Sequence, residues 1–197
     1  AGYWEIPASE TTAIRGRWLP GPGAALFQAI EAALGELPII AEDLGIITPD
    51  VDALRHEFSL PGMRILQFAF SEDGDNTNAD LPHNFDSNTV VYTGTHDNNT
   101  TQGWWHNASP ALRQQVLDYL GADNDHDMHW QLIRAASASV ANTAIHPLQD
   151  VLGLGTEHRM NLPGQGEGHW AWRFSWAQVQ PWHAERLARL GSLYRRN

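Results

Sequence analysis

The segment VVYTGTHDNNTTQGWW, residues 90–105, decides the interpretation of the fold, because an apolar run leads directly into a polar cluster. Residues 89–94, TVVYTG, are rich in β-branched side chains and predict a strand. The next six residues, Thr95 to Thr100, all carry side chains that donate or accept hydrogen bonds. A strand that ends in such a cluster predicts a polar binding site at its carboxyl end.

The composition is that of a folded, acidic protein. The 197 residues are 42% hydrophobic and include nine tryptophans, which is enough for one ordinary core. The net charge is −11 and all twelve basic residues are arginines without a cluster, which argues against nucleic acid and anionic membranes as partners. The absence of cysteine excludes disulfides and thiolate metal sites and fits a cytoplasmic location.

Strand-like and helix-like segments alternate along the chain, which predicts an α/β fold with parallel strands covered on both faces. Each strand-like segment ends in a polar loop: AEDLG, FSEDGD, GTHDNN or HPLQD. We expect helices at 24–35, 48–58, 109–121, 130–143 and 180–196, and strands at 37–40, 63–70, 89–94 and within 144–155.

Polar residues at the carboxyl ends of successive parallel strands are typical of a (β/α)8 barrel, the TIM-barrel fold. A doubly wound sheet would give the same alternation, but it usually offers a GxGxxG phosphate turn, which this sequence lacks. A barrel needs eight βα units in about 250 residues. The chain supplies about four such units, or half a barrel.

Two carboxylates follow predicted strands. Glu42 comes directly after LPIIA, where partial burial would raise its pKa toward that of a general acid, although it could equally just open a loop. Asp43 should point the other way if the pleat continues. Asp97 follows the strand at 89–94, with His96 and Asn98 beside it. Carboxylates delivered from two strand ends can flank one sugar ring, as glycosidases require.

Ten histidines raise the question of a metal site. His126 and His129 lie three residues apart, next to Asp125 and Asp127, but this stretch is more typical of a solvated connection between helices. A third spaced ligand is missing. We therefore expect no metal and no cofactor. Among the tryptophans, Trp104 and Trp105 could stack on sugars or simply pack in the core.

Several blocks of the sequence, in this order, resemble the amylomaltases, which are bacterial 4-α-glucanotransferases similar to the plant disproportionating enzymes. The resemblance implies a (β/α)8 barrel of the α-amylase clan. It also implies a retaining double displacement that passes an α-1,4-glucan segment to the 4-hydroxyl of another glucan, with maltooligosaccharides and α-1,4-glucans as substrates. The blocks are YWEIPAS (3–9), GRW (16–18), IIAEDLGIITPDV (39–51), LPGMRILQFAF (60–70), LPHNF (81–85), VVYTGTHDN (90–98), HPLQDVLGLG (146–155) and RMNLPG (159–164).

The resemblance assigns roles to individual residues. Glu42 matches the acid/base of the family, and Asp97 matches the residue that stabilises the transition state. His96 matches a ligand of a sugar hydroxyl, whereas Asn99 stands where the family often has an aspartate and receives no acid role. Further substrate contacts are expected from Asp43, Asn98 and Asn161, and Phe68 and Trp4 either line the apolar faces of the sugar rings or simply pack in the protein.

The family places its nucleophilic aspartate just before the YWEIPAS block, where this chain starts without an initiator methionine. Residues 1–197 are therefore expected to be the C-terminal half of a catalytic barrel and a fragment of a longer enzyme, inactive alone. The expected partner is the N-terminal half of the same barrel. Two alternatives remain: a non-catalytic glucan-binding module and an α-amylase-type hydrolase.

Overall fold

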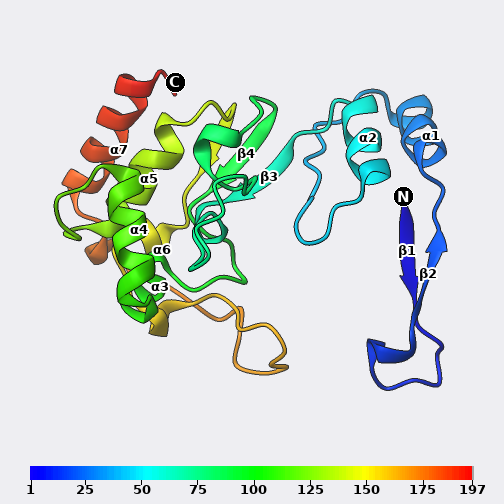
Figure 1. Cartoon of the computed structure of the whole chain (residues 1–197), viewed down its shortest axis with the longest axis horizontal. Helices are drawn as coiled ribbons and strands as arrows, with labels where there is room; N and C mark the ends of the chain where they lie inside the picture. The colour runs from blue at the N-terminus through cyan, green and yellow to red at the C-terminus, as the bar shows by residue number, and fades with distance from the viewer. Residues whose placement is uncertain (197) are drawn as a thin grey trace. The chain divides into compact units, whose positions relative to one another are not determined.

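The computed structural model describes residues 1–196, which fall into two compact units (Figure 1). The first unit is residues 1–62, drawn from blue to cyan, and the second starts at Met63 and runs to the red end of the chain. No helix within residues 1–196 has the length and apolar character needed to cross a membrane. The two units are described separately.

The first unit opens with a hairpin that the sequence did not predict. Strand β1 (Gly2–Glu5) pairs antiparallel with β2 (Arg17–Pro20), and Trp4 lies opposite Trp18. The two indole rings meet edge to face at 5.5 Å, a favoured geometry for aromatic pairs. Within each strand, neighbouring residues lie on opposite faces, so this cross-strand pair helps to fix the register.

Two helices follow, close to where the periodicity placed them. Helix α1 is Ala24–Leu34, and α2 is Pro49–Glu57 with Thr48 at its N-cap and proline at its first position. The strand expected at 37–40 is wrong, because this segment is irregular. Its amides bond locally, Ile39 N to Leu37 O, and a strand is stable only as part of a hydrogen-bonded ladder.

The second unit contains a three-stranded sheet in the order β3-β4-β5. Strand β3 is Gly62–Ile65, β4 is Thr89–Tyr92 and β5 is Thr143–Ile145. Strands β4 and β5 pair in parallel, with Val91 opposite Ala144, which confirms an α/β fold with parallel pairing. The strand expected at 63–70 is shorter than predicted, since Leu66–Phe68 turns into a 3-10 helix.

The helices of the second unit follow the predicted order with three changes. The helix expected at 130–143 instead ends at Ala138, and the chain turns there into β5. Two helices were not predicted: α3, which starts directly after the polar cluster, and α6, which lies where a strand and a turn were expected. The helices are α3 (Thr101–Asn107), α4 (Pro110–Leu120), α5 (Met128–Ala138), α6 (Leu148–Val151) and α7 (Pro181–Tyr194).

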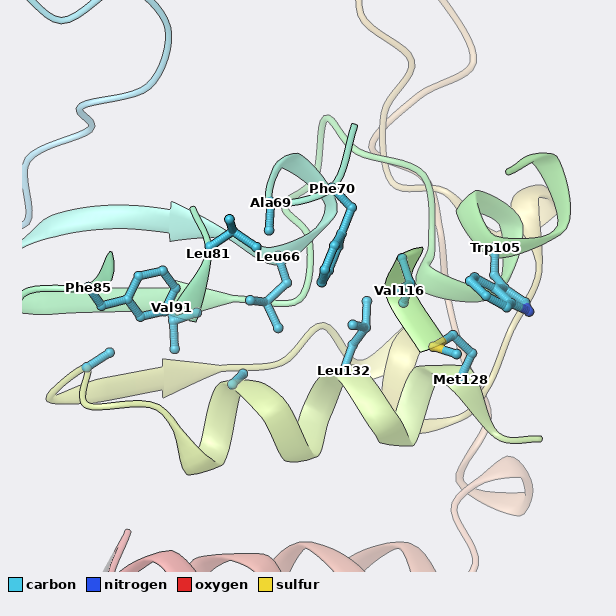
Figure 2. Close-up of a cluster of buried hydrophobic side chains, with 12 residues drawn as sticks. Leu66, Ala69, Phe70, Leu81, Phe85, Val91, Trp105, Val116, Met128 and Leu132 are labelled. Carbon is cyan, nitrogen blue, oxygen red and sulfur yellow. The ribbon is translucent and has the colours of Figure 1, made fainter. Parts of the chain in front are cut away.

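Helix α5 is the centre of the core. Met128, Leu132 and Ala136 recur every four residues and are fully buried on one side of it. Figure 2 shows Leu132 of α5 pointing toward Leu66 and Phe70, which lie in the segment after β3. Burying one leucine side chain stabilises the fold by roughly 1.5–3 kcal/mol. The regular spacing of these residues explains why this helix was predictable.

The other side of α5 packs against α6 and α7. Trp130 and Ile133 join Val151 of α6 in a second buried cluster, against which α7 packs Leu187 and Leu190. The guanidinium of Arg196 donates to the carbonyl oxygens of residues 136, 137, 139 and 141. These acceptors include backbone groups that the end of α5 leaves without an intrahelical partner. Both faces of α5 are thus covered.

His129 is enclosed in this region and is 6% exposed. Burial lowers the pKa of its imidazole from 6.5 to about 4. Asp127 partly opposes this lowering, whereas Arg186 and His183 add to it. The ring also lies against Gly153, where an added Cβ would come within 2.8 Å of Nε2. The folded protein therefore holds this histidine in its neutral form.

This burial predicts a dependence of stability on pH. Between pH 6.5 and about 4 the unfolded chain binds a proton at His129 that the folded chain does not, so the free energy of unfolding falls as the pH falls. The loss should reach about 1–3 kcal/mol, from about 1.4 kcal/mol per unit of pKa. Urea unfolding of His129→Gln should show a flatter pH dependence. Exposed His126→Gln is the control and should keep the original slope; equal slopes for the two variants would contradict the prediction.

Candidate functional site

The loop that joins β4 to α3 is organised around Asn98. Its side-chain Oδ1 accepts hydrogen bonds from Thr95 N at 2.9 Å and from Thr95 Oγ1 at 2.8 Å. The same threonine oxygen accepts from Asp97 N at 3.3 Å. These bonds form a compact turn that leaves the side chains of His96 and Asp97 exposed. The Oδ1 atom of Asn98 is therefore used in holding the loop together.

A distant segment holds Asp97 in place. Asn161 Nδ2 donates to Asp97 Oδ1 at 2.6 Å, and Arg159 Nη2 donates to the Asp97 carbonyl at 2.8 Å. On the other side, His96 Nε2 lies 3.4 Å from Asp97 Oδ1. Hydrogen bonds to a carboxylate fix its direction. Four of the residues expected at the site, His96, Asp97, Asn98 and Asn161, thus lie together in the second unit.

A pocket opens beside this loop, and an unpredicted tryptophan contributes to it. Trp170 lines it together with His96 and Arg159, and the rings of Trp170 and His96 are 4.9 Å apart. Trp170 is 59% exposed and has φ of 62°, a left-handed conformation that is unusual for a bulky residue. The Gly- and Trp-rich composition of residues 164–176 was the available signal, but it does not say which tryptophan faces the pocket.

The carboxyl ends of β4 and β5 are joined by a buried carboxylate. Asp150 Oδ2 accepts from Thr93 Oγ1 at 2.5 Å and from Thr101 Oγ1 at 2.8 Å, while Oδ1 accepts from Thr101 N at 2.7 Å. Burial raises the pKa of Asp150, and these three hydrogen bonds partly oppose the rise. HPLQD was noted as a polar loop, but its aspartate was not predicted to be a site residue.

Asn99 connects the same loop to the segment after α6. Its Nδ2 donates to Thr156 Oγ1 at 3.0 Å, and its backbone carbonyl accepts from Gln67 Nε2 at 2.8 Å. Gly103 of α3 lies against this pair, and a Cβ there would collide with both Asn99 Oδ1 and Thr156 Oγ1. The glycine is therefore needed for close approach.

Three of the expected site residues, Glu42, Asp43 and Trp4, belong to the first unit, and they differ in exposure and in contacts. Glu42 is exposed, which corrects the expectation of a partly buried carboxyl, because no strand forms before it. Asp43 is 8% exposed and its Oδ2 lies 3.5 Å from Nε of buried Arg55. This burial favours a structural ion pair over contact with a sugar. Trp4 packs in the hairpin, and its Nε1 donates to Ala13 O at 3.0 Å.

Exposure and packing distinguish the remaining aromatic candidates, Phe68, Trp104 and Trp105. Phe68 is 48% exposed, so its ring is available for contact, but no described contact places it at the pocket. Trp105 is buried in the core and Trp104 packs against the same cluster, so both are packing residues. Among residues 1–196 no group of three or more acidic or histidine side chains is placed to hold a metal ion.

An imidazole, an amide and an indole, from His96, Asn98 and Trp170, line this pocket, and the exposed carboxylate of Asp97 stands between the first two in sequence without lining it. Such groups in an α/β fold are typical of a carbohydrate-active protein, since sugars offer hydroxyls to bond and faces to stack on. The family comparison is more specific. The sequence pattern of glycoside hydrolase family 77, 4-alpha-glucanotransferase, matches residues 1–179. The chain belongs to this 4-alpha-glucanotransferase family.

Individual relatives agree with the family. A 4-alpha-glucanotransferase of Synechocystis is 53% identical over 196 residues and one of Thermus thermophilus is 49% identical over 193, covering 98% and 94% of this chain. The chain spans 38% of the length of each of these relatives. An amylomaltase structure from Streptococcus agalactiae, in complex with acarbose, matches 99% of this chain and 39% of its own, with 34% identity and a TM-score of 0.93.

The close contact at Gly103 yields a stability prediction. Gly103→Ala should destabilise the protein by about 1–3 kcal/mol, because the added methyl group must displace Asn99 and Thr156. Helix propensity alone would predict the opposite sign, since alanine favours a helix by up to about 1 kcal/mol over glycine. Thermal unfolding measures the difference. Gly166→Ala, where an added Cβ meets nothing within 4 Å, is the control; a neutral Gly103→Ala would refute the steric argument.

Proposed function

We propose that this chain forms part of the catalytic barrel of a 4-α-glucanotransferase. The enzyme would cut an α-1,4-glucan by a retaining double displacement and pass the segment to the 4-hydroxyl of another glucan or of glucose. The observation that carries the proposal is the held carboxylate of Asp97, bonded by Asn161 beside the His96–Trp170 pocket, in a member of this family. The acarbose complex of the Streptococcus relative supports maltooligosaccharides and α-1,4-glucans as substrates.

Asp97 is proposed to stabilise the positive charge that develops at the anomeric carbon, a role that suits a carboxylate with a fixed direction. Glu42 is proposed as the acid/base, and its exposed side chain is free to reach a bound glycosidic oxygen. In a retaining mechanism the acid/base and the nucleophile are about 5–5.5 Å apart. The nucleophilic aspartate is proposed to belong to the N-terminal half of the barrel. A cytoplasmic location remains a proposal as well.

The first unit supports the proposed partner. Among residues 1–62, all of which the structure describes, Leu60 is the one apolar side chain that is buried. Ile14, Trp18 and Ile46 are 85%, 71% and 98% exposed. Exposed apolar side chains that outnumber the buried ones in a unit indicate a surface that another segment covers. We propose that the N-terminal half of the same barrel covers these side chains in the longer enzyme.

The proposal predicts which chain is active. Residues 1–197 alone should not turn over maltotriose, because removing a nucleophile from a catalytic unit removes most of the rate. The longer chain, with the proposed N-terminal half, should give glucose together with maltooligosaccharides longer than maltotriose, measured by anion-exchange chromatography. Glucose and maltose without longer products would indicate a hydrolase, and turnover by residues 1–197 alone would refute the proposed division of the barrel.

The roles of the two carboxylates can be separated in the longer chain. An α-glucosyl fluoride leaves without a proton, so it should rescue the first step in Glu42→Gln, and a covalent glucosyl adduct should accumulate. Asp97→Asn should be rescued little, since it loses stabilisation that both steps need. On maltotriose, losing the acid/base should cost roughly 10²–10⁴-fold in rate. Mass spectrometry detects the adduct; rescue of Asp97→Asn with Glu42→Gln inactive would reverse the assignment.

A further inference from the structure

We propose that Asp150 is a positioning residue for the catalytic loop, an inference that rests on the proposed glucanotransferase function. Asp150 lies in α6, about 50 residues along the chain from the loop that carries Asp97, and it bonds both ends of that loop. Thr93 precedes the loop and Thr101 follows it. One carboxylate therefore sets the distance between the two ends.

Asp150, Thr93 and Thr101 together form a clamp, which is rigid because all three side chains are buried. Asp150 is 1% exposed, and Thr93 and Thr101 are both 0% exposed. The two oxygens of the carboxylate accept from three donors, so a small displacement of either loop end would leave a buried polar group without its partner. Such a loss is costly in a dry interior, which restricts the loop to one geometry.

The clamp fixes the position of Asp97 because only a few residues of chain separate Asp97 from Thr93 and from Thr101. The turn of Thr95 and Asn98 is built on the strand end that Thr93 anchors, and Asp97 lies within that turn. On the far side, Gln67 Nε2 bonds the carbonyl of Asn99 next to the anchored helix start. The exposed carboxylate is therefore mounted on a buried, fixed base, which is what preorganised charge stabilisation requires.

A packing role alone does not account for a carboxylate at this position. The bonds described for Asp150 come from two hydroxyls and one backbone amide, all neutral donors, so this polar group is buried without a cation among these partners. An apolar side chain of similar size would avoid that cost of burial. The carboxylate supplies what an apolar side chain cannot: two oxygens that hold two separate segments together. It is among the residues that line the pocket, but with 1% exposure it is too enclosed to contact a sugar directly.

The test uses the longer chain and the variants Thr93→Val and Thr93→Ser. Valine keeps the shape of threonine but removes the donor to Asp150, whereas serine keeps the hydroxyl. Thr89→Val is the matched control, because Thr89 is a buried threonine at the opposite end of the same strand, with 3% exposure. Asp150→Asn is a second probe of the same bonds.

Thr93→Val should lower kcat on maltotriose by roughly 10- to 100-fold, as expected for a small misplacement of a catalytic group, with KM changed by less than about threefold. Thr93→Ser should restore most of kcat, and Thr89→Val should leave it within about twofold. Amide hydrogen exchange over residues 94–101 should accelerate in Thr93→Val and Asp150→Asn but not in Thr89→Val.

The two readouts separate this inference from the proposed function. If the unmodified longer chain does not produce maltooligosaccharides that are longer than maltotriose, the proposed function fails. The hydrogen-exchange comparison still tests the positioning role of Asp150. If Thr93→Val shows the kcat of the unmodified enzyme, or the same exchange over residues 94–101 as Thr89→Val, the positioning role of Asp150 is overturned. A loss of kcat that Thr93→Ser shares would also overturn it, because the hydroxyl would then not be the cause.

Discussion

The parallel pairing of β4 with β5 is the constraint on which the rest of the second unit depends. With Val91 opposite Ala144, the two strands end at the same edge of the sheet. The segments that follow them, with Asp97 in one and Asp150 in the other, are therefore neighbours although they are about 50 residues apart in sequence. Antiparallel pairing would have sent these segments to opposite edges. The site is thus a consequence of strand direction before any side chain is considered.

Helix α5 supports that pairing from below the sheet (Figure 2). Its side chains at 128, 132 and 136 are buried against the sheet side, and those at 130 and 133 against α6 and α7. A helix covered on both faces cannot shift without opening two clusters at once. This rigidity lets the edge of the sheet carry a costly feature, the buried carboxyl group of Asp150.

The sequence predicted what periodicity and capping encode, and missed what pairing decides. Helix α4 is the best case, since Ser109 caps its first turn by accepting from Leu112 N, and Gly121 ends it in the left-handed conformation. The segment at 37–40 looks like a strand, but apolar content cannot reveal whether a neighbouring strand is present. Asn161 was expected as a sugar contact from the family resemblance, but its hydrogen bond to Asp97 was not predicted. Asp150 and Trp170 were missed because their roles depend on contacts that only the folded chain brings together.

The first unit, residues 1–62, is not held together by a hydrophobic core of its own. Fixing one residue costs about 1–2 kcal/mol of backbone entropy, which 62 residues with one buried apolar side chain cannot offset through their own core. What it does contain is local: the Trp4–Trp18 pair and the buried Arg55, which bonds Asp52 Oδ1 at 3.0 Å and Leu60 O at 3.3 Å. Such contacts fix conformation more than they stabilise it. The exposed apolar side chains of this unit, among them Ile14, Trp18 and Ile46, are the surface that the proposed N-terminal half of the barrel would bury.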